Sequence, residues 1–205
     1  MYIPPSFLET DPNKLHDFME QHSFATLISS HEGEPVASHL PLLLDRDAEP
    51  HGRLIGHFAR ANSHWQAASE QRVLSIFHGS HAYVSPGWME AQNVVPTWNY
   101  VTVHAYGTLR LIEDRDRLRD IVRRTVETYE ANRATPWSMS QPEAEFLDKL
   151  LAAIVGFEIG IDRLEGKWKL NQNHPLERRE QIMRGLRDTG RHDELQIAAL
   201  MDATR

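Results

Sequence analysis

The stretch VVPTWNYVTVHAYG, residues 94–107, decides how the rest of the chain is interpreted. In its second half apolar and polar residues alternate, which is the period of two typical of a half-buried β-strand. The entrance of this strand holds Trp98, Asn99 and Tyr100, a concentration of flat rings and an amide. We therefore expect either a planar ligand at this point or an aromatic cluster that closes one end of a sheet.

Size and composition exclude several classes of protein. The chain has 205 residues, 40% of them hydrophobic, and a net charge of −7, which disfavours broad nucleic-acid binding. It has no cysteine, so disulfides, thiolate catalysis and cysteine-based metal sites are excluded. We find neither an apolar run of about 18–20 residues for a membrane span nor a secretory signal, and we expect a cytoplasmic protein without a membrane partner.

Hydrophobic periodicity predicts an α+β protein built on a small β-barrel, with helices added at the edges. Strands are expected at 24–28, 35–44, 53–59, 72–80, 100–112 and 154–163. Helices are expected from Pro12 onward and at 62–70, 114–129, 144–152, 176–187 and 193–203. Two glycine positions are interpreted as turns: Gly79-Ser80, at the end of the strand expected at 72–80, and Gly166, after the strand expected at 154–163.

Two segments combine an expected strand with side chains that could bind a ligand. In GHFARANS, residues 56–63, a strand ends, Arg60 follows and a helix begins, which suits either a phosphate clamp or a surface salt bridge. His39 lies in an apolar strand, where it could contact a ligand or be a core histidine. The motif H-x-x-H at His78 and His81 is too weak to predict a metal site, and no catalytic residue is assigned.

Eight stretches, taken together, resemble a known family across residues 1–173. They are MYIPPSF, FATLIS, GEPVASHLPLLLD, GHFARANSHW, HAYVSPGW, VPTWNYVTVHAYG, IVGFEI and EGKWKLNQN. In this order they resemble the PaiB-like family of FMN-binding negative transcriptional regulators. The resemblance implies a six-stranded antiparallel split β-barrel of the FMN-binding type, with peripheral helices and a C-terminal helical pair.

The resemblance also implies a homodimer that holds FMN at the subunit interface. The barrel domain is expected at 1–173 with a helical insertion at about 114–152, followed by a helical extension at 174–205. Arg60 and Asn62 become candidates for the phosphate clamp, and His57 and Ala59 for contacts with the ring or the ribityl chain. The remaining expected cofactor-binding residues are Ser38, His39, Ala61, Trp98, Asn99, Tyr100, Lys167, Lys169 and Gln172.

Three alternatives stay open at this stage. The first is a flavin-dependent oxidoreductase, of the NAD(P)H:flavin or pyridoxamine-phosphate-oxidase type. The second is heme binding, with His39, His57 or His104 as iron ligands. The third is direct DNA contact through the arginine-containing helices of residues 176–203, although acidic neighbours dilute their charge and two covering helices are the simpler interpretation.

Overall fold

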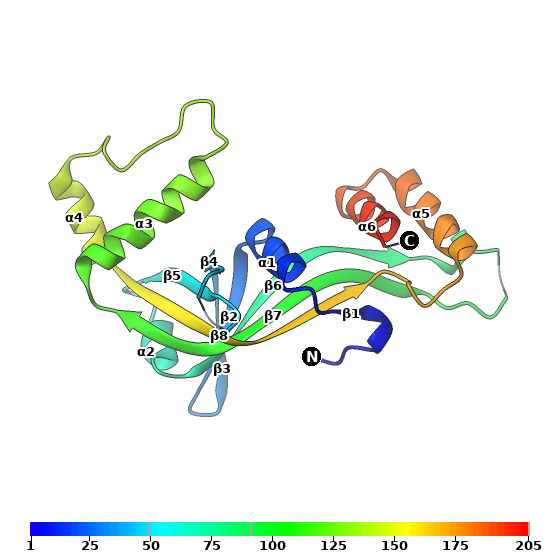
Figure 1. Ribbon diagram of the computed structural model, residues 1–205, viewed down its shortest axis with the longest axis horizontal. Helices are drawn as coiled ribbons and strands as arrows, with labels where there is room; N and C mark the ends of the chain where they lie inside the picture. Colours follow the sequence, from blue (N-terminus) through cyan, green and yellow to red (C-terminus); the bar gives the residue numbers. More distant parts are fainter. Residues whose placement is uncertain (49, 91, 205) are drawn as a thin grey trace. The chain divides into compact units, whose positions relative to one another are not determined.

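The computed structural model describes residues 1–48, 50–90 and 92–204. These residues form eight strands and six α-helices, whose arrangement Figure 1 shows. The strands are β1 (Leu8–Glu9), β2 (Phe24–His31), β3 (Glu34–Pro41), β4 (Leu43–Asp45), β5 (Arg53–Ala59), β6 (Arg72–Val84), β7 (Thr97–Ile112) and β8 (Ile154–Lys169). The helices are α1 (Pro12–Gln21), α2 (His64–Ala68), α3 (Arg115–Glu130), α4 (Ala144–Ala152), α5 (Leu176–Thr189) and α6 (His192–Asp202).

The strands form one sheet in the order β3-β2-β6-β7-β8-β5-β4, and β1 pairs with β8 outside this path. The expected hairpin is present, because β2 and β3 pair antiparallel from Phe24 opposite Pro41 to His31 opposite Glu34. Its turn places Glu32 and Gly33 at positive φ. The expected α+β class with an antiparallel sheet is confirmed, whereas the expected count of six strands is wrong. The extra strands, β1 and β4, have only two and three residues, too few to show a period.

Both glycine positions interpreted as turns lie inside strands instead. Gly79 is in the middle of β6, and Gly166 lies in β8 opposite Glu9 of β1. A Cβ at Gly79 would stand 2.8 Å from the ring of Phe18, and one at Gly166 would collide with the side chain of Leu15. Glycine is therefore used here to let α1 pack closely on the sheet rather than to reverse the chain.

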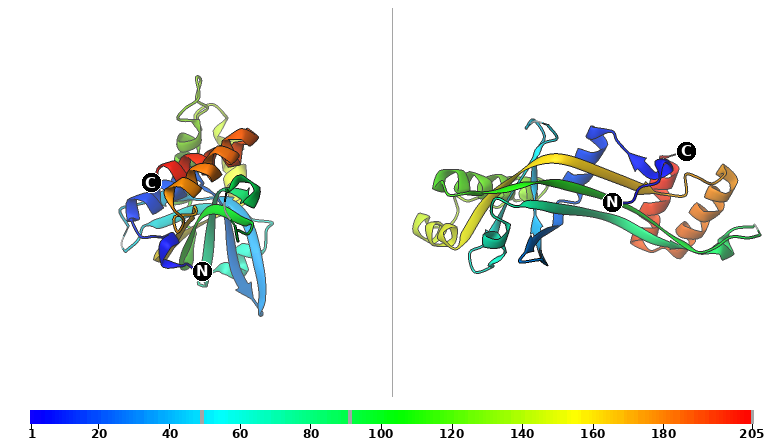
Figure 2. Two further views of the ribbon diagram at one scale, coloured as in Figure 1. Left: turned by 90° about the vertical axis from the view of Figure 1, so that its right-hand side faces the viewer. Right: turned by 90° about the horizontal axis from the view of Figure 1, so that it is seen from below.

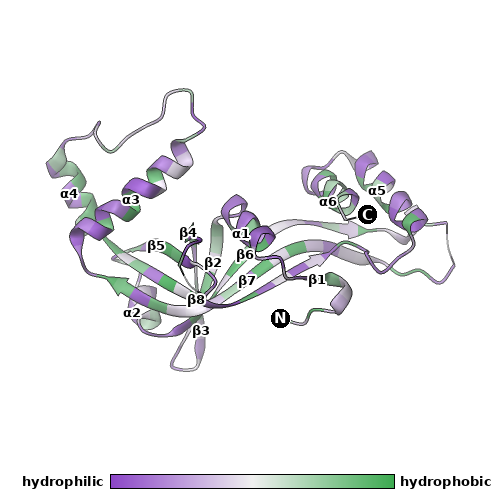
Figure 3. Cartoon of the chain, viewed as in Figure 1, coloured by the Kyte–Doolittle hydropathy of each residue, from purple (hydrophilic) through white to green (hydrophobic). Residues whose placement is uncertain are grey.

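The chain divides into two compact units. The α3–α4 unit comprises residues 19–76 and 105–164, and the α5–α6 unit comprises residues 1–18, 77–104 and 165–205. Hydrophobic and hydrophilic residues alternate along β7 and β8, as Figure 3 shows, which is the pattern that the sequence predicted for these strands. No helix among the described residues is long and apolar enough to cross a membrane.

Each unit has its own apolar core. In the α3–α4 unit, the rings of Phe58 and Phe157 pack with their centroids 4.7 Å apart, and Leu27, Leu54 and Ile159 are fully buried. In the α5–α6 unit, the two C-terminal helices pack side by side (Figure 2). The fully buried side chains that line the inner faces of these helices are Ile182, Leu186, Ile197 and Met201.

Candidate functional site

The expected cofactor-binding residues fall into two groups, one in each unit. The α3–α4 unit holds Ser38, His39, His57, Ala59, Arg60, Ala61 and Asn62. The α5–α6 unit holds Trp98, Asn99, Tyr100, Lys167, Lys169 and Gln172. Within each unit the structure shows which of these side chains meet and which are committed elsewhere.

Four side chains of the α3–α4 unit form a connected polar cluster, which we call the serine–histidine cluster. His64, only 2% exposed, lies between two hydroxyls: its Nε2 is 2.9 Å from Ser29 Oγ and its Nδ1 is 2.8 Å from Ser38 Oγ. Asn62 Nδ2 donates to the same Ser38 oxygen at 3.0 Å. Burial lowers the pKa of His64, so the ring is neutral and one nitrogen donates while the other accepts.

Asn62 also determines where α2 begins. Its Oδ1 accepts a hydrogen bond of 3.0 Å from the backbone N–H of His64, the first residue of the helix. The sequence predicted that Asn62 or Ser63 would cap this helix, and Ser63 makes no capping bond through its side chain. One side chain therefore starts the helix and links it to Ser38 on β3.

Arg60 holds the junction between α4 and β8. Its Nε donates to the carbonyl of Ala152 at 2.8 Å and its Nη2 donates to the carbonyl of Ile154 at 3.0 Å. Ala59 and Ala61 are exposed on either side of it. Two of the three guanidinium nitrogens are thus used for structure, which leaves Nη1 as the nitrogen that could take part in the expected phosphate clamp.

The two histidines expected at the cofactor have different surroundings. His39 is exposed on β3, where its Nδ1 lies 3.1 Å from Thr26 Oγ1 and its ring stacks on Phe24. His57 is half-buried on β5, and this burial lowers its pKa. At neutral pH His57 is therefore an uncharged hydrogen-bonding group.

In the α5–α6 unit, rings and histidines surround a cavity of about 450 Å³, which we call the aromatic cavity. It is lined by Met1, His78, Gly79, His81, Trp98, Tyr100, Val101, Thr102 and His104. Trp98 is 53% exposed and packs edge-on against Tyr83, with centroids 5.8 Å apart. Burial, and next the nearby amino-terminal charge, lower the pKa of His104, which keeps this ring neutral.

Asn99 faces away from the aromatic cavity, although it lies between Trp98 and Tyr100 in sequence. Side chains alternate along a strand, so Asn99 points to the opposite face of β7. There it is fully buried, its Nδ2 lies 3.4 Å from the sulfur of Met201, and its Oδ1 has no hydrogen-bond partner.

The C-terminal candidates make contacts within the same unit. Lys167 donates to the carbonyl of Tyr2 at 3.0 Å, and its ammonium lies 5.1 Å from the centre of the Tyr100 ring. Lys169 donates to Thr97 Oγ1 at 2.5 Å and also to the carbonyl of Trp98. Gln172 closes the turn after β8 with both ends of its amide, donating to the carbonyl of Trp168 and accepting from Leu170 N.

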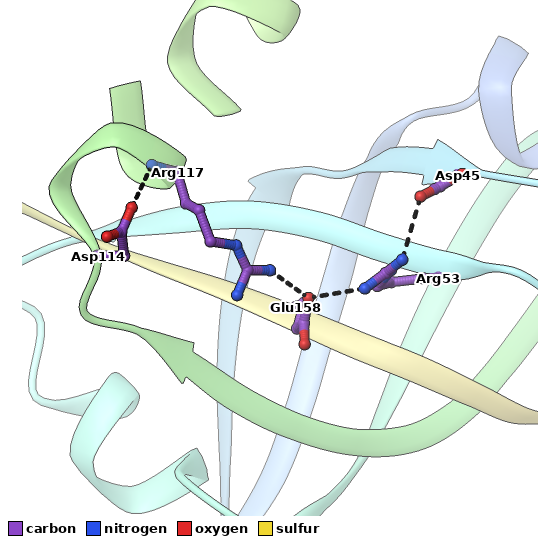
Figure 4. A network of polar contacts seen from close by, with 5 residues as sticks. All are labelled: Asp45, Arg53, Asp114, Arg117 and Glu158. Carbon is purple, nitrogen blue, oxygen red and sulfur yellow. Dashed lines mark hydrogen bonds and ion pairs between the residues drawn. The ribbon is translucent and has the colours of Figure 1, made fainter. Parts of the chain in front are cut away.

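A second cavity, of about 360 Å³, lies beneath α3 in the α3–α4 unit, and four charged residues of its lining are paired with one another. Glu158 accepts from Arg53 at 3.1 Å and from Arg117 at 2.8 Å, and Arg53 also approaches Asp45 at 3.4 Å (Figure 4). Asp114 caps α3 by accepting from the backbone N–H of Arg117. We call this region the charge-paired cavity.

Most arginines of the C-terminal helices are also engaged. Arg179 is buried and donates to the carbonyls of Met201 and Thr204, so it joins α5 to the end of α6. Arg187 pairs with Asp202, and Arg191 lies 3.6 Å from Glu194. These contacts match the interpretation of the segment as two packed helices.

Sequence reasoning missed several residues of these sites. His64 is central to the serine–histidine cluster, and His78 and His81 line the aromatic cavity. The sequence did contain one indication of His64, namely its position two residues after Asn62. The side chain of an asparagine that begins a helix hydrogen-bonds to the backbone two residues later, so those two residues lie close together. For His78 and His81 the signal was hidden by the wrong interpretation of Gly79-Ser80 as a turn.

Comparison with known proteins identifies the family. A family model described as "Putative FMN-binding domain" matches residues 1–163. The chain is 34% identical over 203 residues to "Protease synthase and sporulation protein PAI 2" of Bacillus subtilis (strain 168), an alignment that covers 98% of this chain and 97% of that protein.

Solved structures share the fold. The FAD and heme binding protein from Mycobacterium smegmatis aligns with a TM-score of 0.60 and 16% identity over 87% of this chain and 80% of that one. The flavocytochrome Anf3 from Azotobacter vinelandii aligns with a TM-score of 0.59 and 14% identity over 79% and 69% of the two chains. The expected split-barrel fold, the expected cofactor FMN and the family resemblance are confirmed. The chain belongs to the PaiB-like family and carries its FMN-binding domain.

Proposed function

We propose that this protein is a homodimeric regulator of the PaiB-like type, in which FMN lies at the interface between two copies of the chain. The observation that carries the proposal is a pair of exposed aromatic residues: Trp98, which lines the aromatic cavity, and Tyr83, which packs edge-on against Trp98. Trp98 and Tyr83 are 53% and 43% exposed on one surface. Exposed aromatic side chains that gather in this way are typical of binding and partner surfaces, and a second copy would cover them.

The residues of the aromatic cavity fit a flavin. Trp98 and Tyr100 offer ring faces on which a flat ring system can stack, while Thr102 and the neutral His104 offer hydrogen bonds to its polar edge. The volume of about 450 Å³ lies within the range of about 300–1,000 Å³ that is usual for cofactor sites. The bound flavin would supply the redox chemistry, and the chain would supply position and electrostatics.

We retain the other expected cofactor contacts as part of this proposal. Nη1 of Arg60 is the free end of a guanidinium held at two other nitrogens, so it can donate without a large loss of side-chain entropy. Ser38 and Asn62 are held in place by the serine–histidine cluster. We also propose that residues 1–173 form the FMN-binding domain, with the helical insertion at about 114–152, and that 174–205 form its helical extension.

The regulatory part of the proposal rests on the likeness to PAI 2, whose name refers to protease synthesis and sporulation. Direct contact with DNA is less well supported, because Arg179 is buried and Arg187 and Arg191 lie beside carboxylates. A salt-dependent gel shift that is lost when Arg178 and Arg184 are replaced by alanine would favour DNA contact. Without such a shift, we expect regulation through a protein or metabolite partner in the cytoplasm.

Linked measurements of flavin binding and dimerisation test the proposal. The chain is titrated with FMN by visible absorbance while its association state is followed by analytical ultracentrifugation. We expect one FMN per chain and a dimer whose dissociation constant falls when FMN is added, because a ligand that binds only the dimer stabilises it. Binding of FMN with equal affinity to monomer and dimer would contradict an interface site, and no binding would contradict the flavin function.

Heme is the second candidate ligand, because three histidines line the aromatic cavity. His78, His81 and His104 come from adjacent strands β6 and β7, and the neutral state of His104 suits a metal ligand. A Soret band that appears with added hemin and disappears in His104→Ala would favour heme. A band that is unchanged by alanine at all three positions would exclude these histidines as ligands.

A further inference from the structure

A third cavity, of about 290 Å³, lies in the α5–α6 unit and has a lining without aspartate or glutamate. It is bounded by the loop that precedes β7, the end of β8 and the start of α5, and we call it the cationic cavity. Its polar lining consists of Asn93, Thr97, Lys169, Asn171, Asn173, His174 and Arg178. In a chain with a net charge of −7, a cavity that gathers positive charge without carboxylates is unusual.

The ammonium group of Lys169 is only partly satisfied by the chain. It donates to Thr97 Oγ1 and to the carbonyl of Trp98, which leaves one N–H of three for another acceptor. Among the residues that the structure describes, the hydrogen-bond partners of this ammonium are these two uncharged oxygens and no carboxylate. Burial first, and then the charge of Lys167, lower the pKa of Lys169. A bound anion would counteract both effects, because an opposite charge nearby stabilises the charged ammonium.

A histidine and an arginine present further donors to the same cavity. Arg178 Nη1 lies 3.2 Å from His174 Nδ1. Because a guanidinium can only donate, Nδ1 must accept, and the proton of the neutral ring is on Nε2. Burial and then the charge of Arg178 lower the pKa of His174, in agreement with a neutral ring. His174 is therefore an N–H donor, and the other guanidinium nitrogens of Arg178 remain available.

Asn171 supplies an independent indication of a ligand. It is 5% exposed and lines the cavity, yet its Oδ1 has no hydrogen-bond partner. A buried polar atom without a partner costs free energy, so such atoms are rare unless a ligand or water completes them. The amide can accept from a ligand hydroxyl or, after a half-turn about χ2, donate through Nδ2 to an anion.

We propose that the cationic cavity binds the phosphate group of a small phosphate monoester. The donors of Lys169, His174 and Arg178, together with the three asparagine amides, exceed what a carboxylate can accept, whereas a phosphate group has three terminal oxygens to receive them. The apolar part of the lining, Phe7, Met89, Val94 and Val95, would contact the organic remainder of the ligand. No residue lines both this cavity and the aromatic cavity, although Lys169 is also one of the cofactor contacts retained in the proposed function.

Calorimetric titration with inorganic phosphate, at constant ionic strength set with chloride, tests the site on the full chain. We expect saturable binding that weakens about 10- to 100-fold in Arg178→Gln and in Lys169→Met, the loss expected for one charge-assisted hydrogen bond. Arg184→Gln, on the exposed face of the same helix, and Lys149→Met, on α4, are matched controls that should bind phosphate like the parent chain.

A nearly isosteric variant guards against effects of misfolding. Asn171→Asp adds a negative charge inside the cavity and should abolish phosphate binding, whereas Asn132→Asp, on an exposed loop, should not. Linear binding of phosphate without saturation, or equal weakening in the control variants, would overturn the proposal.

The source of the phosphate group is resolved by two further titrations. If the group belongs to FMN, the parent chain should bind FMN more tightly than riboflavin, and Asn171→Asp should erase that difference. If it belongs to a separate ligand, inorganic phosphate should bind equally well to the apoprotein and to the FMN complex. If the parent chain binds FMN but shows no saturable binding of phosphate, this site is rejected and the proposed function is unaffected.

Discussion

The charge-paired cavity and the cationic cavity are similar in volume, about 360 and 290 Å³, but opposite in how their charges are balanced. Beneath α3, Glu158 lies between Arg53 and Arg117, so the chain neutralises its own cations. At the start of α5, Lys169 and Arg178 line a cavity to which the fold contributes no carboxylate. Ion pairs within the chain hold its elements together. A cavity whose cations have no carboxylate partner is instead a candidate site for an anionic ligand.

The largest effect is expected where polar groups are fully matched, in the serine–histidine cluster. His64→Ala removes the ring that joins Ser29 to Ser38 and leaves a cavity beside Phe58. We expect a loss of about 3 kcal/mol in the free energy of unfolding, from two unsatisfied hydroxyls and the cavity together. Denaturant unfolding measures it, and a loss below about 1 kcal/mol would show that the cluster is not a stabilising network.

A smaller loss is expected in the charge-paired cavity. Glu158→Gln leaves Arg53 and Arg117 without their shared carboxylate, and we expect a loss of about 1–2 kcal/mol because both arginines are partly exposed. Glu145→Gln is the matched control, since it breaks an exposed pair with Lys149 and should cost less than about 0.5 kcal/mol. Equal losses of stability in the two variants would show that the ion pairs of the charge-paired cavity contribute no more than an exposed surface pair.

The pH dependence of stability gives a smaller effect still, because it comes from the protonation of single groups. The pKa of His64 is lowered in the folded protein, so below a pH of about 6.5 the unfolded chain binds a proton that the native chain does not. Stability from this group is full above that pH and is lost as the pH falls toward the folded pKa. His57 acts in the same direction. Unfolding at several pH values should show a shallower decline in His64→Ala than in the parent, and parallel curves would contradict a buried neutral ring.

The smallest effect is expected in the cationic cavity when no ligand is present. Arg178→Gln removes a charge whose hydrogen bond goes to His174 rather than to a carboxylate. We expect the free energy of unfolding in phosphate-free buffer to change by less than about 0.5 kcal/mol, in contrast to Glu158→Gln. A loss above about 2 kcal/mol would mean that Arg178 is a structural residue and that the contrast between the cavities is false.

The sequence predicted most of the fold because the long elements have clear periods. Strand β5 and helix α4 begin and end where the sequence predicted, and the hairpin of β2 and β3 was indicated by its turn. The predictions that failed concern short strands, or residues whose role depends on contact with another element of the fold. The strands β1 and β4 are too brief to show alternation, and Gly79 and Gly166 are needed by α1, which no local pattern reveals.

The sequence predicted which segments line the candidate site better than it predicted which side chains point into it. Trp98 and Tyr100 do line a cavity together, as the opening stretch suggested. The alternation of a strand separates Asn99 from them, and both ends of the Gln172 amide close a local turn. The balance of charge in each cavity could not be read from the sequence, because the carboxylates that neutralise Arg53 come from β4 and β8.

Native mass spectrometry of the chain, purified and then incubated with excess FMN, tests the central claim most directly. A dimeric FMN-binding protein predicts one dominant species, whose mass equals two chains plus two FMN molecules, and dissociation to monomers should release the flavin. A dominant monomer that carries one FMN, or a dimer that carries none, would contradict the account.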